Sequence, residues 1–159
     1  GEAAEAADIV FLAVPYAGQQ GALTELGPIL TRDKKICVSL VAPLVFEDGR
    51  TRGAPPPGGS AAEEGAAQVP GARWVAGLHT LSAVDLRRIG TPMNTDGLVC
   101  GDDDEAKHAV MTLVDEIEGL RAVDAGPLEC ARYLEGTTAL LLNINRLHKA
   151  HASIRVVGL

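Results

Sequence analysis

The run Asp8-Ile-Val-Phe-Leu-Ala-Val14 is continuously apolar after its first residue, contains β-branched side chains, and is followed at once by Pro15. Such a run is typical of a strand covered on both faces, because a half-exposed strand would alternate polar and apolar residues. The same pattern returns at residues 35–41 and at residues 73–78. The sequence therefore predicts three buried strands in its first half.

Helices are predicted in the intervals between strands. Ser60 and Glu63 form a capping box, which predicts the start of a helix. The acidic run 102–105 favours another helix start, because a helix N-terminus carries partial positive charge. Alternating strands and helices indicate an open, doubly wound α/β sheet with parallel strands. The predicted helices are 17–30 (closing at Gly27-Pro28 or shortly after), 61–69, 82–89, 102–118 and 128–149; further strands are 98–100 and 120–124; residues 47–59 form a Pro/Gly-rich loop, and 154–159 are extended or irregular.

Size, charge and cysteine content exclude several classes of protein. The 159 residues, 47% hydrophobic and 22% charged, suit one globular domain. A net charge of −7 without any Lys/Arg cluster argues against a nucleic-acid partner. The longest apolar run, Ile9 to Pro15, is far shorter than the ~20 residues that cross a bilayer. With no signal-peptide pattern either, we expect a soluble, cytoplasmic protein without a membrane partner. The cysteines, expected to be buried thiols, are Cys37, Cys100 and Cys130.

In open α/β sheets, ligands bind beyond the carboxyl ends of the strands. We therefore expect residues 14–16, 41–44, 78–83 and 124–127 to lie together at one edge. In the first two segments a proline comes directly after an apolar strand, which would give a stiff wall suited to a planar ring. Prolines also end strands for no functional reason, so this signal is weak by itself.

His79 is the candidate catalytic residue at this edge, between Leu78 and Thr80. Its imidazole can donate a hydrogen bond to a carbonyl or carboxylate, or titrate near neutral pH. The alternative is a histidine whose polar atoms are satisfied by the backbone. Sequence spacing alone leaves both interpretations open.

Three other polar clusters are not assigned to ligands. His148 and His151 have a spacing that permits a metal pair, but no third ligand accompanies them. Gly58-Gly59-Ser60 precedes a helix as a phosphate loop would, yet two glutamates in the first turn would repel phosphate, so we interpret it as a cap. The run 102–105 is likewise interpreted as a solvated helix cap. We predict no metal site.

Several stretches of the sequence resemble the F420-dependent NADP reductases, which are NADPH-dependent reductases of the deazaflavin coenzyme F420. The most specific pair is Gly101-Asp-Asp-Asp-Glu-Ala-Lys107 followed by Asp124-Ala-Gly-Pro-Leu128, in that order. The resemblance covers essentially all 159 residues. The other matching stretches are Ser60–Glu63, Leu78-His79-Thr80, Gly119–Asp124, Leu134-Glu135 and Thr137–Ile144.

The resemblance implies a Rossmann-like fold with a doubly wound, mostly parallel sheet and a long C-terminal helix. It divides the chain into an incomplete NADP-binding domain over residues 1–126 and a C-terminal helical segment over residues 127–159, which contributes to the deazaflavin pocket. It implies an oxidoreductase in which NADP and coenzyme F420 stack face to face and exchange a hydride directly. The cofactors then carry the chemistry and the protein aligns them.

The resemblance also implies where individual residues lie around the two cofactors. Val14, Pro15 and Tyr16 would line the NADP side, with Ala83 near it. Ala42, Pro43 and His79 would border the junction of the two rings, and Thr138 and the region of Ala152 would lie on the deazaflavin side.

One part of the family pattern has no counterpart in these 159 residues: the first strand, its glycine-rich turn and the Ser/Arg that holds the 2′-phosphate. We therefore expect the N-terminal βαβ unit to be missing, which would leave a sheet edge unpaired and favour a homo-oligomer, such as a dimer. Two alternatives follow. One is an NADP-linked reductase of another acceptor, such as an imine or a ferric complex, on the same scaffold. The other is a truncated or degenerate non-enzymatic domain, inactive by itself.

Overall fold

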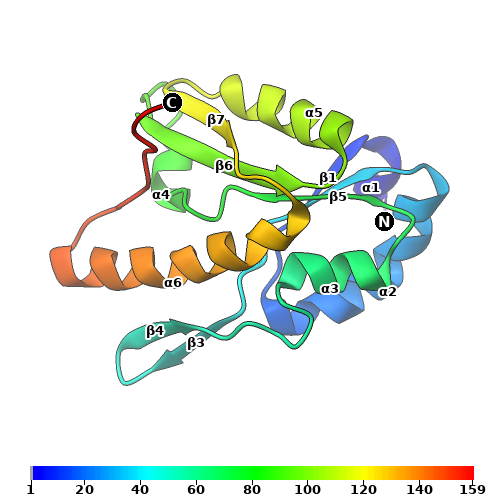
Figure 1. Ribbon diagram of the computed structural model, residues 1–159, viewed down its shortest axis with the longest axis horizontal. Helices are drawn as coiled ribbons and strands as arrows, with labels where there is room; N and C mark the ends of the chain where they lie inside the picture. The colour runs from blue at the N-terminus through cyan, green and yellow to red at the C-terminus, as the bar shows by residue number, and fades with distance from the viewer. Residues whose placement is uncertain (1) are drawn as a thin grey trace.

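A computed structural model describes residues 2–159 of the chain. Its centre is a five-stranded sheet with the strand order β1-β2-β5-β6-β7 (Figure 1). Most neighbouring strands are parallel and helices cover both faces, so the predicted doubly wound, mostly parallel α/β class is confirmed. The strands of this sheet are β1 (Ile9–Leu12), β2 (Ile36–Ser39), β5 (Arg73–Gly77), β6 (Thr95–Gly101) and β7 (Leu120–Asp124).

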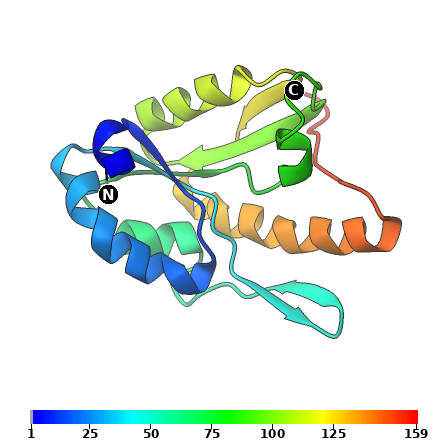
Figure 2. The same cartoon turned by 180° about the vertical axis from the view of Figure 1, so that it is seen from behind.

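The helices divide between the two faces of the sheet, as the views from either side show (Figure 1, Figure 2). Helices α2, α3 and α6 contribute the buried residues of one face, and α5 covers the other. The predicted long C-terminal helix is present as a short 3-10 turn that leads into α6. The bounds are α1 (Glu2–Ala6), α2 (Tyr16–Arg32), α3 (Ala61–Gln68), α4 (Ala83–Leu86), α5 (Asp104–Asp115), η1 (Leu128–Cys130) and α6 (Ala131–His148).

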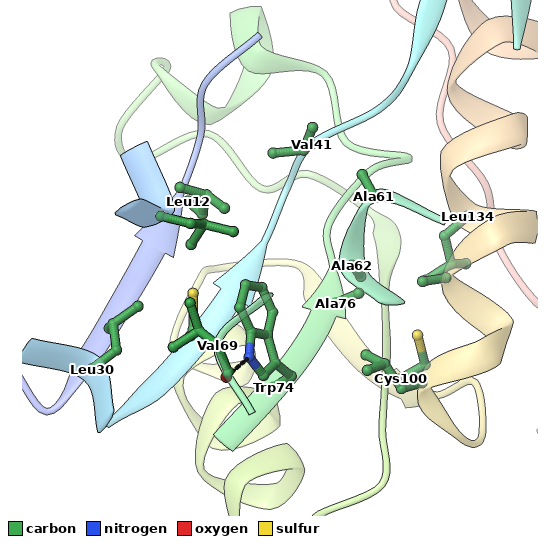
Figure 3. Packing of buried hydrophobic residues seen from close by; sticks show 14 residues of the cluster. Leu12, Leu30, Val41, Ala61, Ala62, Val69, Trp74, Ala76, Cys100 and Leu134 are labelled. Atoms are coloured by element: carbon green, nitrogen blue, oxygen red, sulfur yellow. Dashed lines mark hydrogen bonds between the residues drawn. The ribbon is translucent and has the colours of Figure 1, made fainter. Parts of the chain in front are cut away.

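Side chains of the central strands alternate between two hydrophobic cores. Cys37 and Trp74 point into the core beneath α2, α3 and α6, whereas Val38 and Val75 point into the core beneath α5. The Trp74 ring lies against Gly65 of α3, and its indole N–H donates to the Val69 carbonyl at 3.0 Å (Figure 3). Every second residue therefore serves the same face, as a pleated strand requires.

Strand β1 is covered less completely than its apolar run predicts. Leu12 is buried against α2, but Phe11, on the opposite face, is 40% exposed. Strand β1 is the edge strand of the sheet, and α5 lies over the strands further along. The expectation that this strand is covered on both faces is therefore wrong for the face that carries Phe11.

Strand β6 runs antiparallel to β5, against the expectation of parallel strands throughout. A parallel return would need a crossover that traverses the sheet, which is usually an α-helix. The one helix in this connection, α4, has four residues and therefore a rise of only about 6 Å. Strand β6 consequently starts at the edge where β5 ends, and β7 runs parallel to it.

The predicted loop 47–59 contains part of a β-hairpin formed by β3 (Leu44–Glu47) and β4 (Arg50–Gly53). Its turn, Asp48-Gly49, has positive φ at both residues (49° and 67°), the requirement of a type I′ turn. The hairpin packs on α6, where the Asn143 amide exchanges two hydrogen bonds with the Thr51 backbone, at 3.0 and 2.6 Å. A pattern dominated by Gly and Pro concealed this Asp-Gly turn signal.

The cysteines are free thiols, as expected. Cys37 and Cys100 are buried in strands, and burial raises the pKa of each to about 12. Cys130 is only half-buried, because it lies at the end of η1 rather than within α6. Within residues 2–159, none of the helices combines the length and the apolar character that a membrane crossing requires.

Candidate functional site

The carboxyl ends of β1, β2 and β5 lie along one edge of the sheet, because these three strands are parallel neighbours. Residues 14–16, 41–44 and 78–83 follow these strands and therefore lie along that edge, as predicted. The segment 124–127 does not join them. It follows β7, which runs in the opposite direction, so it lies beside the start of β5. The expectation that all four segments meet is therefore wrong, because β6 and β7 run in the opposite direction to β5.

A cavity of about 290 Å³ opens at this edge, between the loop after β5, helix α6 and the segment that follows α6. It brings together four of the predicted site residues, His79, Ala83, Thr138 and Ala152. We call it the His79 pocket. The other lining residues are Thr80, Leu81, Ser82, Val84, Leu141, Leu142, Asn145 and His151.

The His79 imidazole is buried and lies directly after Leu78, which takes a left-handed conformation with φ of 63°. Its Nε2 lies 3.1 Å from the Val41 carbonyl oxygen. Because a carbonyl only accepts, Nε2 carries the proton and donates, so Nδ1 of the neutral ring is an acceptor. Burial lowers the pKa of His79 to about 4, although the Val41 hydrogen bond acts in the opposite direction. The imidazole is therefore neutral near pH 7.

Two buried polar atoms beside this pocket have no hydrogen-bond partner in the described part of the chain: His79 Nδ1 and the Thr80 hydroxyl oxygen. Both residues line the pocket. A buried polar atom without a partner costs roughly 1–3 kcal/mol, so a ligand that supplies the missing bonds would be stabilised there. The alternative of a histidine satisfied by the backbone thus holds for only one of its two ring nitrogens, because the backbone satisfies Nε2 and leaves Nδ1 free.

Thr138 joins α6 to the loop that carries His79. Its hydroxyl donates to the His79 carbonyl oxygen at 3.1 Å, and Leu134 O lies 3.4 Å away as a second, weaker acceptor. Two turns further along the same helix face, Asn145 Oδ1 accepts from Ala152 N at 2.5 Å. Helix α6 therefore fixes two walls of the pocket.

The predicted residues Ala42 and Pro43 lie after β2, outside the His79 pocket. Pro43 lines a separate small cavity of about 80 Å³ at the base of the hairpin. Its carbonyl accepts from Ala54 N at 2.9 Å, which closes that base. Ala42 is joined to the pocket only through its neighbour Val41, whose carbonyl holds the His79 ring.

The predicted residues Val14, Pro15 and Tyr16 lie after β1, and Pro15 precedes the first turn of α2. Tyr16 lines a second cavity, of about 550 Å³, together with Gln19 and Glu64. The Tyr16 hydroxyl donates to a Glu64 carboxylate oxygen at 2.7 Å, and this bond raises the pKa of Tyr16. The two cavities share no lining residue, and Ala83 lies in the His79 pocket rather than with Tyr16.

Sequence reasoning missed two buried polar residues near these cavities. Gln19 donates to the Ala61 carbonyl at 2.8 Å and leaves its own amide oxygen buried without a partner. Glu135 accepts from Ala61 N at 2.9 Å and from Ala62 N at 3.2 Å. Burial raises the pKa of Glu135 to about 7, against the lowering effect of these two N–H groups. No local pattern identifies either residue, since their partners lie 42 to 74 positions away.

The N-terminus of α3 is capped by protein groups, in keeping with the interpretation of Gly58-Gly59-Ser60. The Ser60 hydroxyl oxygen accepts from Glu63 N at 3.0 Å, which confirms Ser60 as the N-cap, while the Glu63 carboxylate accepts from the Ser60 hydroxyl at 2.7 Å. The Glu135 carboxylate accepts from the first two N–H groups of the helix, those of Ala61 and Ala62. A phosphate would have to displace this carboxylate.

The two stretches that carry the family resemblance lie at the opposite edge and hold each other. Asp102 accepts from Leu128 N at 2.9 Å, and Lys107 lies 3.0 Å from Asp124. Asp103 caps α5 and forms a bidentate pair with Arg73, which lowers the pKa of Asp103 to about 2. Asp102 therefore fixes the start of η1, which leads into α6. Within residues 2–159, no group of three or more His, Cys, Asp or Glu side chains is arranged to hold a metal ion.

An open, mostly parallel sheet with helices on both faces, and with a pocket beyond the carboxyl ends of its strands, defines a Rossmann-like α/β domain with a candidate ligand site. No protein-family model matches the chain. The F420-dependent NADP reductase of Methanocaldococcus jannaschii is 35% identical over 161 residues, which cover 99% of this chain and 71% of that protein. The F420-dependent NADP reductase of Methanothermobacter thermautotrophicus is 33% identical over 163 residues, covering 99% and 69%. The chain belongs to the F420-dependent NADP reductase family.

A solved structure supports the fold independently. It is a candidate F420-dependent NADP reductase from Arthrobacter sp. FB24, with a TM-score of 0.86 and 24% sequence identity. The similarity covers 99% of this chain and 73% of the other. It confirms the Rossmann-like arrangement, including the long C-terminal helix.

Proposed function

We propose that this chain forms the ring-binding part of an oxidoreductase that transfers a hydride between NADP(H) and coenzyme F420. The observation that carries the proposal is the unpartnered His79 Nδ1 beside a pocket of about 290 Å³, in a member of this reductase family. A pocket of this size suits a ring system better than a whole dinucleotide cofactor. The deazaflavin ring is the occupant that the family suggests.

The residues of the pocket fit a planar heterocycle with polar edges. Leu81, Leu141 and Leu142 supply apolar surface for the ring faces. His79 Nδ1 can accept a hydrogen bond from a ring N–H, and the Thr80 hydroxyl can donate or accept. Because the pKa of His79 lies near 4, its role is to position the ring, not to shuttle a proton.

When bound, the two cofactors supply the hydride donor and acceptor, so no side chain has to form a covalent bond. The protein contributes alignment. Val41 O fixes the tilt of the His79 ring, and the Thr138 hydroxyl fixes the backbone that carries it. We place NADP(H) on the side of Val14, Pro15 and Tyr16, with Ala42 and Pro43 between the two cofactors and with Ala152 on the deazaflavin side. Sequence resemblance supports this placement.

Anaerobic mixing of NADPH and coenzyme F420 with the protein tests the proposal. The expected result is F420 binding by these 159 residues, and loss of the visible absorbance of F420 at a rate proportional to protein concentration when the first strand and glycine-rich turn of the family pattern precede them, with NADH as the comparison donor. Reduction of an imine or a ferric complex without F420 reduction would favour the other reductase on this scaffold. No turnover together with no F420 binding would favour the non-enzymatic alternative.

Three further proposals concern the division of the chain, its location and its assembly. The division into residues 1–126 and 127–159 assigns the deazaflavin side to the second segment. We also propose a cytoplasmic location, in keeping with the expectation from the sequence. A homodimer is supported by Tyr133, Leu140 and Leu147, which recur every seven residues along α6 and are exposed. Light scattering of the wild type and of a Leu140→Glu variant tests the dimer, since the added charge should dissociate it.

A further inference from the structure

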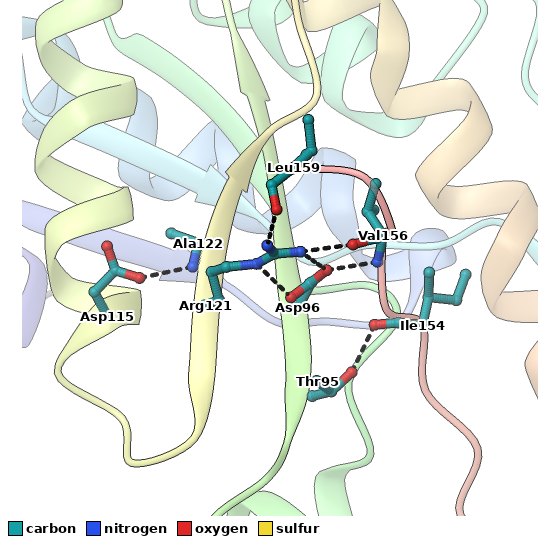
Figure 4. A network of polar contacts seen from close by, with 8 residues as sticks. All are labelled: Thr95, Asp96, Asp115, Arg121, Ala122, Ile154, Val156 and Leu159. Atoms are coloured by element: carbon teal, nitrogen blue, oxygen red, sulfur yellow. Dashed lines mark hydrogen bonds and ion pairs between the residues drawn. The ribbon is translucent and has the colours of Figure 1, made fainter.

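The chain that follows α6 crosses back to the sheet and is anchored there by polar contacts. Its residues 154–159 lie beside the start of β6 and β7, at the same edge as the His79 pocket (Figure 1, Figure 4). We call residues 150–159 the C-terminal segment. Two of them, His151 and Ala152, line the His79 pocket.

An ion pair between a buried carboxylate and a partly exposed guanidinium forms the centre of this anchor. Asp96 of β6 is 1% exposed and accepts two hydrogen bonds from Arg121 of β7, at 2.9 and 2.7 Å (Figure 4). Arg121 and the Val156 N–H together lower the pKa of Asp96, so this carboxylate is charged at neutral pH. A bidentate Arg–carboxylate pair fixes both side chains in one geometry.

Both members of the pair also bind the backbone of the C-terminal segment. Asp96 accepts from Val156 N at 2.6 Å, while Arg121 donates to Val156 O at 2.8 Å and to Leu159 O at 3.2 Å (Figure 4). Two further bonds reach Ile154 O, from the Thr95 hydroxyl at 2.7 Å and from Asp96 N at 3.0 Å. Through these bonds, the backbone of the C-terminal segment pairs with the start of β6 and with Arg121 at the start of β7.

Side-chain burial adds little to this anchorage. Ser153, Arg155, Val157 and Leu159 are exposed, and Ala152, Ile154 and Val156 are half-buried. The hydrogen bonds to Asp96, Arg121 and Thr95 are thus the main attachment. The pairing of β6 with β7 does not depend on them, because those strands have their own backbone register.

The pocket wall lies between two fixed points. On one side, Asn145 of α6 binds the segment through Ala150 N at 3.1 Å and Ala152 N at 2.5 Å. On the other side, Ile154 and Val156 are held at the sheet. His151 and Ala152 lie between these two attachments. Loss of the sheet attachment would free this wall from its second fixed point.

We propose that Asp96 and Arg121 are positioning residues, which hold the C-terminal segment against the sheet and thereby fix one wall of the ring-binding pocket. The effect on cofactor binding rests on the proposed function, whereas the anchoring itself does not. A preformed wall favours binding, because the segment does not have to be ordered when the ligand enters.

Limited trypsin digestion tests the anchor without any cofactor. Arg155 lies within the anchored stretch, so cleavage after it, seen by mass spectrometry as loss of the last four residues, reports release. Arg121→Met should increase this cleavage rate about tenfold or more, and Arg121→Lys, which keeps a charge opposite Asp96, should restore part of the protection. Arg32→Met removes an exposed arginine of α2 and should leave the rate unchanged. Equal rates in wild type and Arg121→Met would overturn the anchor.

Titration of coenzyme F420 by its fluorescence tests the pocket wall. Arg121→Met should weaken binding by about tenfold, and so should a chain that ends at Ser153, in which the Asp96–Arg121 pair is kept and Asp96 is not left unpaired. Melting temperatures identify any variant that fails to fold. Wild-type affinity in both would overturn the role of the wall. If the wild type itself binds no F420, the proposed function fails instead, and the trypsin rates still decide on the anchor.

Discussion

The hydroxyl of Thr138 donates a hydrogen bond to the backbone carbonyl of His79 at 3.1 Å, joining two residues 59 positions apart. Because His79 O accepts this bond while His79 Nε2 donates to Val41, the histidine is held from its backbone and from its ring. The loop after β5 is thereby tied to both α6 and β2, and Nδ1 is the ring nitrogen left for a ligand.

A Thr138→Val substitution should loosen this loop without changing the volume of the side chain. We expect a loss of about 1 kcal/mol in the free energy of unfolding, typical of one hydrogen bond, and weaker F420 binding. The matched control is Thr137→Val, since the Thr137 hydroxyl bonds only within α6, to Tyr133 O at 2.7 Å. Urea unfolding and fluorescence titration measure the two effects. Equal F420 affinity in both variants would contradict a role for Thr138 in positioning His79.

Two substitutions of His79 separate the functions of its two nitrogens. The amide of asparagine lies near the position of Nδ1, and the amide of glutamine near that of Nε2. His79→Asn should therefore retain an acceptor for the ligand, and His79→Gln should retain the donor to Val41. We expect F420 affinity to fall by about tenfold or more in His79→Gln and His79→Ala, and by less in His79→Asn. A ranking with His79→Gln closest to wild type would assign His79 a purely structural role.

The buried His79 should make stability depend on pH. Its pKa is about 4 in the folded state and 6.5 when unperturbed, so between these values the unfolded chain binds more protons. Acidification from pH 6.5 towards 4 should therefore cost up to about 3 kcal/mol of the free energy of unfolding, with no further change below pH 4.

The comparison of wild type with His79→Gln isolates the contribution of His79 to the pH dependence of stability. Glu135, whose pKa is raised to about 7, acts with the opposite sign. Below pH 7 its carboxylate takes up a proton more readily in the folded state than in the unfolded chain, so its contribution to stability increases as the pH falls. It is present in both proteins and cancels in the difference. Urea unfolding at pH 7, 6 and 5 should show the wild type losing stability relative to the variant. A difference that is constant with pH would refute the buried neutral imidazole.

Gly65 of α3 is required by the close approach of Trp74. A Cβ at this position would lie 2.5 Å from a ring carbon of Trp74, so Gly65→Ala should destabilise the fold by about 1–3 kcal/mol through overpacking. Gly21→Ala is the control, because a Cβ in the middle of α2 meets nothing within 4 Å and should stabilise that helix by roughly 0.5–1 kcal/mol. Thermal melts of both variants provide the measurement. Stabilisation by Gly65→Ala would show that the indole can move away at no cost.

The sequence by itself determined the class of the fold and most of its elements. The apolar runs before Pro15 and Pro43 correctly predicted the strands β1 and β2, and Ser60 with Glu63 predicted the start of α3. These signals are local, because strand burial, capping and turn chemistry depend on neighbours a few residues apart. The hairpin was predictable in the same way from Asp48-Gly49, and the Gly/Pro-rich composition around it concealed the signal.

Only the tertiary structure decided the direction of β6, and with it which segments of the chain lie at the site. The reversal places residues 124–127 at the far edge and brings the start of β6, with Asp96, to the pocket edge. Likewise, the partners of His79, Glu135 and Arg121 lie at least 25 residues away in the chain. Strand direction and such contacts follow from which elements can pack together over long sequence separations, and no local preference of a residue encodes that choice.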